Sequence, residues 1–355
     1  MKKSSYTFLE QLIARISPSG YEEDAARLWR EEAATFAAEV RSDTHGNSVA
    51  VVGPGGAPRV MLSGHIDEIG FLVSHIDEKG FLWVAPIGGW DPQIVQGQRV
   101  QIRGRKGIVR GVIGKCPVHL LKEDARNKVV KIDDMWVDIG ARDRKDAEKA
   151  VSVGDPMVLA HALEPMRGSV VAGRGLDDRA GAWVVLEAAR QLAASTALRA
   201  EVHTVATVQE ELGLRGARTS AFGIDPQVGI AVDVTFATDH PSMGHAVRRE
   251  GEVKLGAGAV ITRGPNINPK LFELLVDTAR REKIPHQVIA SARPTGTDAN
   301  AMQINRAGVA TGLLSIPLRY MHSACELVNL KDMDACARLI ARAVARITPE
   351  TVFLA

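Results

Sequence analysis

Two adjacent acids, Glu210 and Glu211, follow a stretch with the character of a strand. The residues before them, from Val202 to Val208, are mostly apolar or β-branched, and Gly213 marks a turn just after them. Ligands usually bind at the carboxyl ends of strands in an open α/β sheet, so the pair lies where a ligand is expected. Two neighbouring carboxylates repel each other, and both stay ionised only when a cation is close. A single pair of this kind is more often a solvated turn than a site.

Four further stretches place acids or a histidine just past an apolar strand or at the start of a helix. They are SGHIDEIG with His65 and Asp67, GRGLDDRAG with Asp177 and Asp178, GIAVDVT with Asp233, and RYMHSACE with His322. Imidazole and carboxylate groups together suit zinc, cobalt or manganese. Because the acids are too many for one tetrahedral ion, the set predicts two ions ~3.5–4 Å apart that share a carboxylate. In the Glu210–Glu211 pair, one acid can hold a metal while the other faces its water as general base.

The elements that position these residues can be predicted from periodicity. Helices are expected over 6–16, 22–37, 178–193, 269–282 and from 332 onward, and strands over 39–43, 48–52, 59–63, 201–208, 228–234 and 309–316. Between about 69 and 160, short strand-like pieces recur with glycine-rich turns between them, as in a small all-β domain. The fold class is therefore α/β, a mixed sheet flanked by helices with an inserted small all-β domain. The predicted domains are 1–68 with 163–355, and the insert 69–162.

Length and composition are those of an ordinary globular protein. The chain has 355 residues, 45% of them hydrophobic and 24% charged, with a net charge of +2 that favours no acidic partner such as nucleic acid. Its three cysteines are too scattered for a disulfide framework. We find neither a signal peptide nor an apolar run of membrane-spanning length, so the expected location is cytoplasmic. The segment GPGGAP at 53–58 lacks the rest of a P-loop and is predicted to be a hairpin turn.

Six motifs, in this order along the chain, resemble the dinuclear-metal aminopeptidases of the glutamyl-aminopeptidase and TET type. They are SGHIDEIG, GRGLDDRAG, QEELGLRGA, AVDVT, GTDANA and SIPLRYMHSACE. The resemblance implies that His65 and Asp233 bind one metal, that Glu211 and His322 bind the other, and that Asp177 bridges them. It also implies that Glu210 is the general base and that Asp67 orients His65.

The resemblance carries three further expectations. The catalytic domain should have a zinc-peptidase-like fold, with a cis peptide bond after Asp177. The insert should assemble subunits into a homo-oligomer, through dimers into a hollow tetrahedral dodecamer. The chain departs from the family pattern at Thr295 and Ala324, where glycine and proline are common, and both changes could alter the substrate pocket.

The predicted function is removal of N-terminal residues from short peptides, with two divalent ions per subunit: zinc first, cobalt or manganese as alternatives. A deacylase or deblocking peptidase that accepts acylated N-termini is the alternative within the hydrolases. A glycoside hydrolase of endoglucanase type is the alternative from a different class, since members of this family have carried that label. It would need two opposed carboxyls ~5–9.5 Å apart and many aromatics, but aromatics make up only 5% of this chain.

Overall fold

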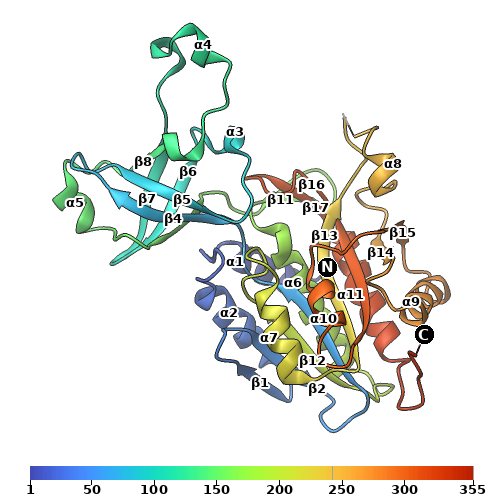
Figure 1. Cartoon of the computed structure of the whole chain (residues 1–355). Coiled ribbons are helices and arrows are strands. Elements are labelled where there is room, and N and C mark those ends of the chain that lie inside the picture. Colours follow the sequence, from blue (N-terminus) through green and yellow to red (C-terminus); the bar gives the residue numbers. More distant parts are fainter. Residues whose placement is uncertain (242, 355) are drawn as a thin grey trace.

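The computed structural model describes residues 1–241 and 243–354. They form a large α/β body and a small β-barrel that projects from one end of it (Figure 1). The α/β body contains both ends of the chain, and the barrel is built from one internal segment. No helix among these residues combines the length and the apolar character needed to cross a lipid bilayer.

The α/β body is centred on a mixed sheet of eleven strands. In its middle, β12, β3, β13 and β16 run parallel to one another, which brings their carboxyl ends to one edge. The outer pairings are antiparallel, except for β15, which runs parallel to β14. The strands are β1 (Glu39–Ser42), β2 (Ser48–Val52), β3 (Arg59–His65), β10 (Glu164–Pro165), β11 (Val170–Gly173), β12 (Glu201–Thr207), β13 (Val228–Phe236), β14 (Ala259–Arg263), β15 (His286–Ala290), β16 (Ala310–Arg319) and β17 (Glu326–Asn329).

Helices cover both faces of this sheet. They are α1 (Lys3–Ile13), α2 (Glu23–Ala33), α6 (Leu176–Ala193), α7 (Arg215–Ile224), α8 (Val247–Glu250), α9 (Pro269–Arg281), α10 (Asp298–Gln303) and α11 (Leu330–Val344). Side chains of β2 alternate between the faces, as the period of a strand requires. Ala50 and Val52 pack in the core formed with α1, α2, α6, α9 and α11, whereas Val49 and Val51 pack in the core formed with α7 and α10. The acids at the sheet edge therefore rest on a core that is closed on both sides.

The barrel is closed by six strands in the order β4-β5-β8-β7-β6-β9. Its elements are β4 (Gly70–Ile76), β5 (Leu82–Ile87), α3 (Pro92–Val95), β6 (Arg99–Gly104), β7 (Gly107–Gly114), η1 (Val118–Leu120), α4 (Glu123–Arg126), η2 (Ile132–Asp134), β8 (Trp136–Asp138), α5 (Arg144–Glu148) and β9 (Pro156–Leu159). Apolar side chains such as Phe71, Val73 and Ile102 fill its interior. The segment between β7 and β8 extends outward as an arm that carries α4 (Figure 1).

The predicted fold class is confirmed: a mixed α/β sheet flanked by helices, with a small β domain inserted. The predicted helices and strands of the α/β body are present, with ends shifted by a few residues. Several elements were not predicted: β10, β11, β14, β15, β17, α7 and α10. The expected hairpin at 53–58 is wrong, because β2 and β3 do not pair; each pairs with β12, which lies between them. All six barrel strands fall within 69–162, and the division of the chain into domains at these boundaries stays a prediction.

Candidate metal centre

The predicted site residues meet at the carboxyl edge of the four central strands. His65 is the last residue of β3, and Asp233 lies near the end of β13. Glu210 and Glu211 follow β12 by a few residues, and His322 follows β16. Asp177 lies in the first turn of α6, which starts beside these strand ends. Parallel strands share one carboxyl edge, so residues more than 250 positions apart in the chain lie in one place.

The Asp177 carboxylate lies between the two histidines. Its Oδ1 is 3.1 Å from His65 Nε2, and its Oδ2 is 3.3 Å from His322 Nε2. The peptide bond that follows, Asp177–Asp178, is cis, as the resemblance implied. A carboxylate that presents one oxygen to each of two imidazoles has the arrangement required of a bridging ligand.

Each imidazole is oriented through its other nitrogen. His65 Nδ1 lies 3.2 Å from the Asp67 carbonyl oxygen and 3.5 Å from its Oδ1. His322 Nδ1 lies 2.9 Å from the carbonyl oxygen of Gly89, a residue between β5 and α3 of the barrel. Because a carbonyl oxygen can only accept, each Nδ1 carries the hydrogen and each Nε2 presents its lone pair to the site in the neutral ring. This is the usual way in which a protein fixes a metal-ligating histidine.

The adjacent acids Glu210 and Glu211 face different groups. Glu211 Oε1 is 3.2 Å from His322 Nε2, whereas Glu210 Oε2 lies 3.9 Å from His65 Nε2. Both backbone amides donate to the Asp67 carboxylate, at 3.1 and 3.2 Å. Asp67 therefore holds the turn as well as His65, a contact that the sequence did not indicate.

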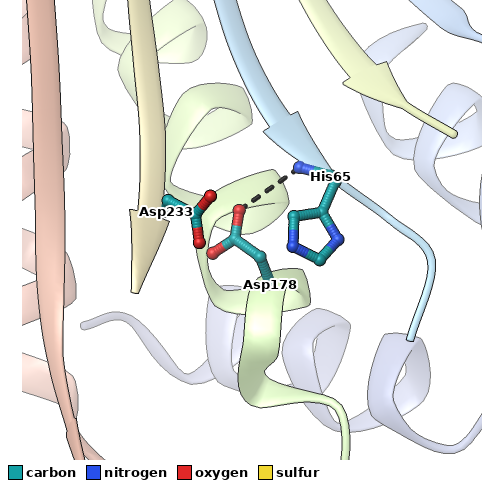
Figure 2. A group of neighbouring side chains, drawn as sticks. All are labelled: His65, Asp178 and Asp233. Carbon is teal, nitrogen blue, oxygen red and sulfur yellow. Dashed lines mark hydrogen bonds between the residues drawn. The ribbon is translucent and has the colours of Figure 1, made fainter. Parts of the chain in front are cut away.

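Asp178 is a further acid beside His65, and the sequence did not single it out as a ligand. Oxygen or nitrogen atoms of His65, Asp178 and Asp233 lie within 4.8 Å of one another, as do those of His65, Asp177 and Glu211. Figure 2 shows Asp178 between Asp233 and His65, with its Oδ2 accepting from the His65 backbone N–H at 3.2 Å. Its Oδ1 accepts from the amide of Gly181 at 2.9 Å. These bonds tie each oxygen of the Asp178 carboxylate to the backbone.

The charges of the cluster fit a cation site. Burial, with repulsion from Asp233 and Asp298, raises the pKa of Glu210 to about 10. Burial also raises the pKa of Asp233 well above its ordinary range. Hydrogen bonds to Asp177 and Glu211 raise the pKa of His322 to about 11. Without a cation, these acids keep their protons and the imidazole stays protonated at neutral pH. Divalent ions would favour the ionised acids and the neutral imidazole instead, so the residues present fit a metal centre.

The cluster opens into a cavity of about 690 Å³. His65, Asp177, Glu210, Glu211, Asp233 and His322 line one side of it. The remaining wall mixes apolar and charged groups, among them Phe236, Ile289, Leu313, Met321, Arg249 and Arg293. Thr295 lines the same cavity, as expected for a residue of the substrate pocket. Ala324 does not line it, because its side chain packs into the barrel core.

A second missed residue, Glu326, supports two of the presumed ligands from behind. Its carboxylate is buried and accepts from the backbone amides of Asp177, at 3.1 Å, and His322, at 2.9 Å. The motif RYMHSACE ends on this residue, so the sequence contained the signal but did not reveal its partners.

A mixed sheet with histidines and acids gathered at its parallel strand ends is an arrangement that suits a metal-dependent hydrolase. The chain belongs to the M42 glutamyl aminopeptidase family, whose pattern matches residues 46–339. The predicted family and the predicted peptidase activity are thereby confirmed, and aminopeptidase activity that depends on metal is the activity of this family.

Relatives of known name resemble the chain along nearly its whole length. It is 42% identical over 348 residues to the lysyl aminopeptidase of Pyrococcus furiosus, with 97% of this chain and 98% of that protein covered. The TET aminopeptidase of the marine sediment archaeon Thaumarchaeota archaeon SCGC AB-539-E09 has a TM-score of 0.92 at 35% identity, with 98% of each chain covered. The TET1 peptidase of Pyrococcus horikoshii has a TM-score of 0.85 at 32% identity, with 96% of this chain and 99% of that chain covered.

Proposed function

We propose that this aminopeptidase removes N-terminal residues from short peptides with two divalent ions bound at the sheet edge. His65 and Asp233 would hold one ion, Glu211 and His322 the other, and Asp177 would touch both. The observation that carries this assignment is the Asp177 carboxylate, which presents one oxygen to each imidazole, at 3.1 and 3.3 Å. When bound, such ions polarise a substrate carbonyl and lower the pKa of a water molecule.

Glu210 is the proposed general base. Its carboxylate lies in the cavity beside His65, and its backbone is held in place by Asp67. Glu210 would accept the proton of the attacking water and pass it to the leaving amine. Its pKa of about 10 shows how strongly this pocket favours the protonated carboxyl. Divalent ions beside it would lower that pKa and so favour the carboxylate, which can take up a proton.

Zinc is the metal we propose first, because the donor set combines imidazole with carboxylate; cobalt and manganese accept the same donors. The proposed substrates are peptides with a free α-amino group. A deblocking peptidase would accept an acylated N-terminus in the same cavity. The glycosidase alternative has less support, because the cavity groups its acids with two imidazoles and so resembles a metal site.

We also propose that the chain assembles through its barrel, with 1–68 and 163–355 as the catalytic domain and 69–162 as the assembly domain. A related TET1 structure contains a dodecamer. The barrel exposes large apolar side chains that its own fold does not cover, such as Ile108 and Leu120. Dimers formed by barrel contacts would be the building block, with a dodecamer as the final assembly.

A substrate panel after metal removal tests the proposed function. The protein would be stripped with a chelator and assayed on aminoacyl-p-nitroanilides with zinc, cobalt or manganese restored. We expect activity to vanish on stripping and to return with metal, and an N-acetylated peptide to resist cleavage. Faster cleavage of the acetylated peptide would favour the deblocking alternative. Hydrolysis of a soluble glucan that survives the chelator would favour a glycosidase.

A further inference from the structure

Four consecutive backbone amides, at positions 208–211, donate to side chains from other parts of the chain. They begin where the pairing of β12 with β3 ends, at Thr207. Their acceptors come from three separate loops near the N-terminus. The four bonds are Val208 N to Asn47 Oδ1 at 3.1 Å, Gln209 N to Glu22 Oε1 at 3.1 Å, Glu210 N to Asp67 Oδ1 at 3.1 Å, and Glu211 N to Asp67 Oδ2 at 3.2 Å.

These bonds fix the backbone at the point where it changes direction. Gln209 has a φ of 53°, in the left-handed region that residues other than glycine rarely adopt. After it the chain leaves the strand, and the side chains of Glu210 and Glu211 point to different partners. The direction of each carboxylate therefore depends on how the amides before it are held.

Glu22 connects the turn after β12 to the loop between α1 and α2. It is buried, and its Oε1 accepts from two amides: that of Gln209 and that of Gly20, at 2.7 Å. One oxygen thus joins the loop between α1 and α2 to the turn after β12. In the same loop, Ser19 Oγ donates to Asp67 Oδ2 at 2.6 Å, so the Asp67 carboxylate is also held from this side.

Asn47 holds the other end of the turn. It is fully buried, and its Nδ2 donates to Asp43 Oδ2 at 2.7 Å and to Thr219 Oγ1 at 2.9 Å. Because both partners can accept these bonds, the amide nitrogen faces them and Oδ1 is left to face the amide of Val208.

We propose that Glu22 and Asn47 are positioning residues that set the directions of the Glu210 and Glu211 carboxylates. Neither lines the cavity, and both act through the backbone of residues 208 and 209. Reacting groups must be held within about 0.5 Å of a productive geometry, and a displacement of about 1 Å can cost on the order of 10²-fold in rate. The proposal rests on the proposed function of Glu210 and Glu211.

Three variants of the full-length, metal-reconstituted protein test it: Glu22→Ala, Glu22→Gln and Asn47→Ala. Glutamine keeps an acceptor oxygen in place of Oε1 but removes the negative charge. It therefore tests whether position 22 needs only a hydrogen-bond acceptor or also the charge. We expect Glu22→Ala and Asn47→Ala to lower kcat by about 10–100-fold with KM changed by less than about twofold. Glu22→Gln should restore most of the loss.

Asp332 supplies a matched control. It is a buried acid that accepts from two backbone amides, those of Gly256 and Gly258, at 2.7 Å each, at the start of α11. Asp332→Ala should lower the melting temperature and leave kcat close to that of wild type. An equal loss of kcat in Asp332→Ala would mean that any buried acid has this effect, and would overturn the proposal.

Hydrogen exchange adds a readout that does not depend on activity. In metal-free protein, a peptide covering residues 205–214 should exchange faster in Glu22→Ala and Asn47→Ala than in wild type, and Glu22→Gln should restore protection. Unchanged exchange in both alanine variants, or a Glu22→Gln enzyme as slow as Glu22→Ala, would overturn the proposal. Should the wild type lack aminopeptidase activity, the proposed function fails while hydrogen exchange still decides the positioning role.

Discussion

The edge of the large sheet and the interior of the barrel are both buried, but they contain different residues. The sheet edge gathers buried histidine and acids, among them His65, Asp177 and Asp233. The barrel interior is lined by apolar side chains such as Phe71 and Met157. Parallel strands bring several carboxyl ends together, whereas the antiparallel barrel closes on itself and distributes its strand ends to both rims. The parallel sheet therefore gathers reactive side chains at one edge, whereas the barrel leaves its outer surface available for contacts between subunits.

One of the places where the two regions meet is the loop between β5 and α3. There the Gly89 carbonyl oxygen accepts from His322 Nδ1 at 2.9 Å. A β-carbon at the preceding residue, Gly88, would lie 2.4 Å from Ile69 Cγ2, so the loop has no room for a side chain there. The barrel thus contributes backbone to the site, and the sheet contributes the reactive side chains.

The largest effect should come from Glu210→Gln. The amide has nearly the size of the acid but cannot accept the water's proton, and positioned bases contribute about 10²–10⁴-fold. We expect kcat to fall by at least that range, with KM, metal content and assembly little changed. Steady-state kinetics and metal analysis by mass spectrometry check this. Loss of metal from Glu210→Gln would show that this acid is a ligand.

The neighbouring substitution, Glu211→Gln, should behave differently. Glu211 Oε1 lies 3.2 Å from His322 Nε2, so its loss weakens the second metal position. We expect metal content to fall towards about one ion per subunit, and added metal to restore part of the activity. Full metal content in Glu211→Gln together with metal loss in Glu210→Gln would mean that the two roles are exchanged.

The acidity of the cluster predicts how stability should depend on pH. In metal-free protein, the pKa of Glu210 is raised from 4.5 to about 10, and that of His322 from 6.5 to about 11. Between the ordinary pKa and the raised pKa of each group, the folded state binds more protons than the unfolded state. The free energy of unfolding therefore falls as pH rises. Metal-bound ligands are already deprotonated and lack this dependence.

The melting temperature gained on adding zinc should therefore grow between about pH 6.5 and pH 9. Differential scanning fluorimetry of stripped and reconstituted protein measures it. A gain that stays constant over this interval would contradict the proposed binding of one metal ion by His322 with Glu210 beside the metal centre.

The motifs at strand ends were readable from the sequence because each joins an apolar run to its ligand within a few residues. The positioning role of Glu22 and Asn47 could not be predicted from the sequence, since their partners lie more than 150 residues away and only the tertiary fold brings them together. Strand β15 was missed for a different reason: its side chains are half-buried or exposed and form no apolar run. Helices α7 and α10 are short, and each follows a glycine-containing turn, which hides their periodicity.

The smallest effect on catalysis is expected from a barrel substitution, Leu120→Glu. This side chain is 76% exposed in the arm between β7 and β8, where a charge would disfavour an apolar contact between subunits. We expect weaker dimers in light scattering and a kcat close to that of wild type. The matched control is Ile304→Glu, on the α/β body, where the side chain is 73% exposed. Dimers that resist Leu120→Glu but dissociate in Ile304→Glu would place the contact outside the barrel.

Whether the Asp177 carboxylate bridges two ions can be tested with an anomalous-scattering map of crystals grown with zinc or cobalt. We expect two peaks ~3.5–4 Å apart at the sheet edge, with one Asp177 oxygen bound to each. A single peak, or a pair held by Asp178 with Asp177 outside the coordination sphere, would contradict it.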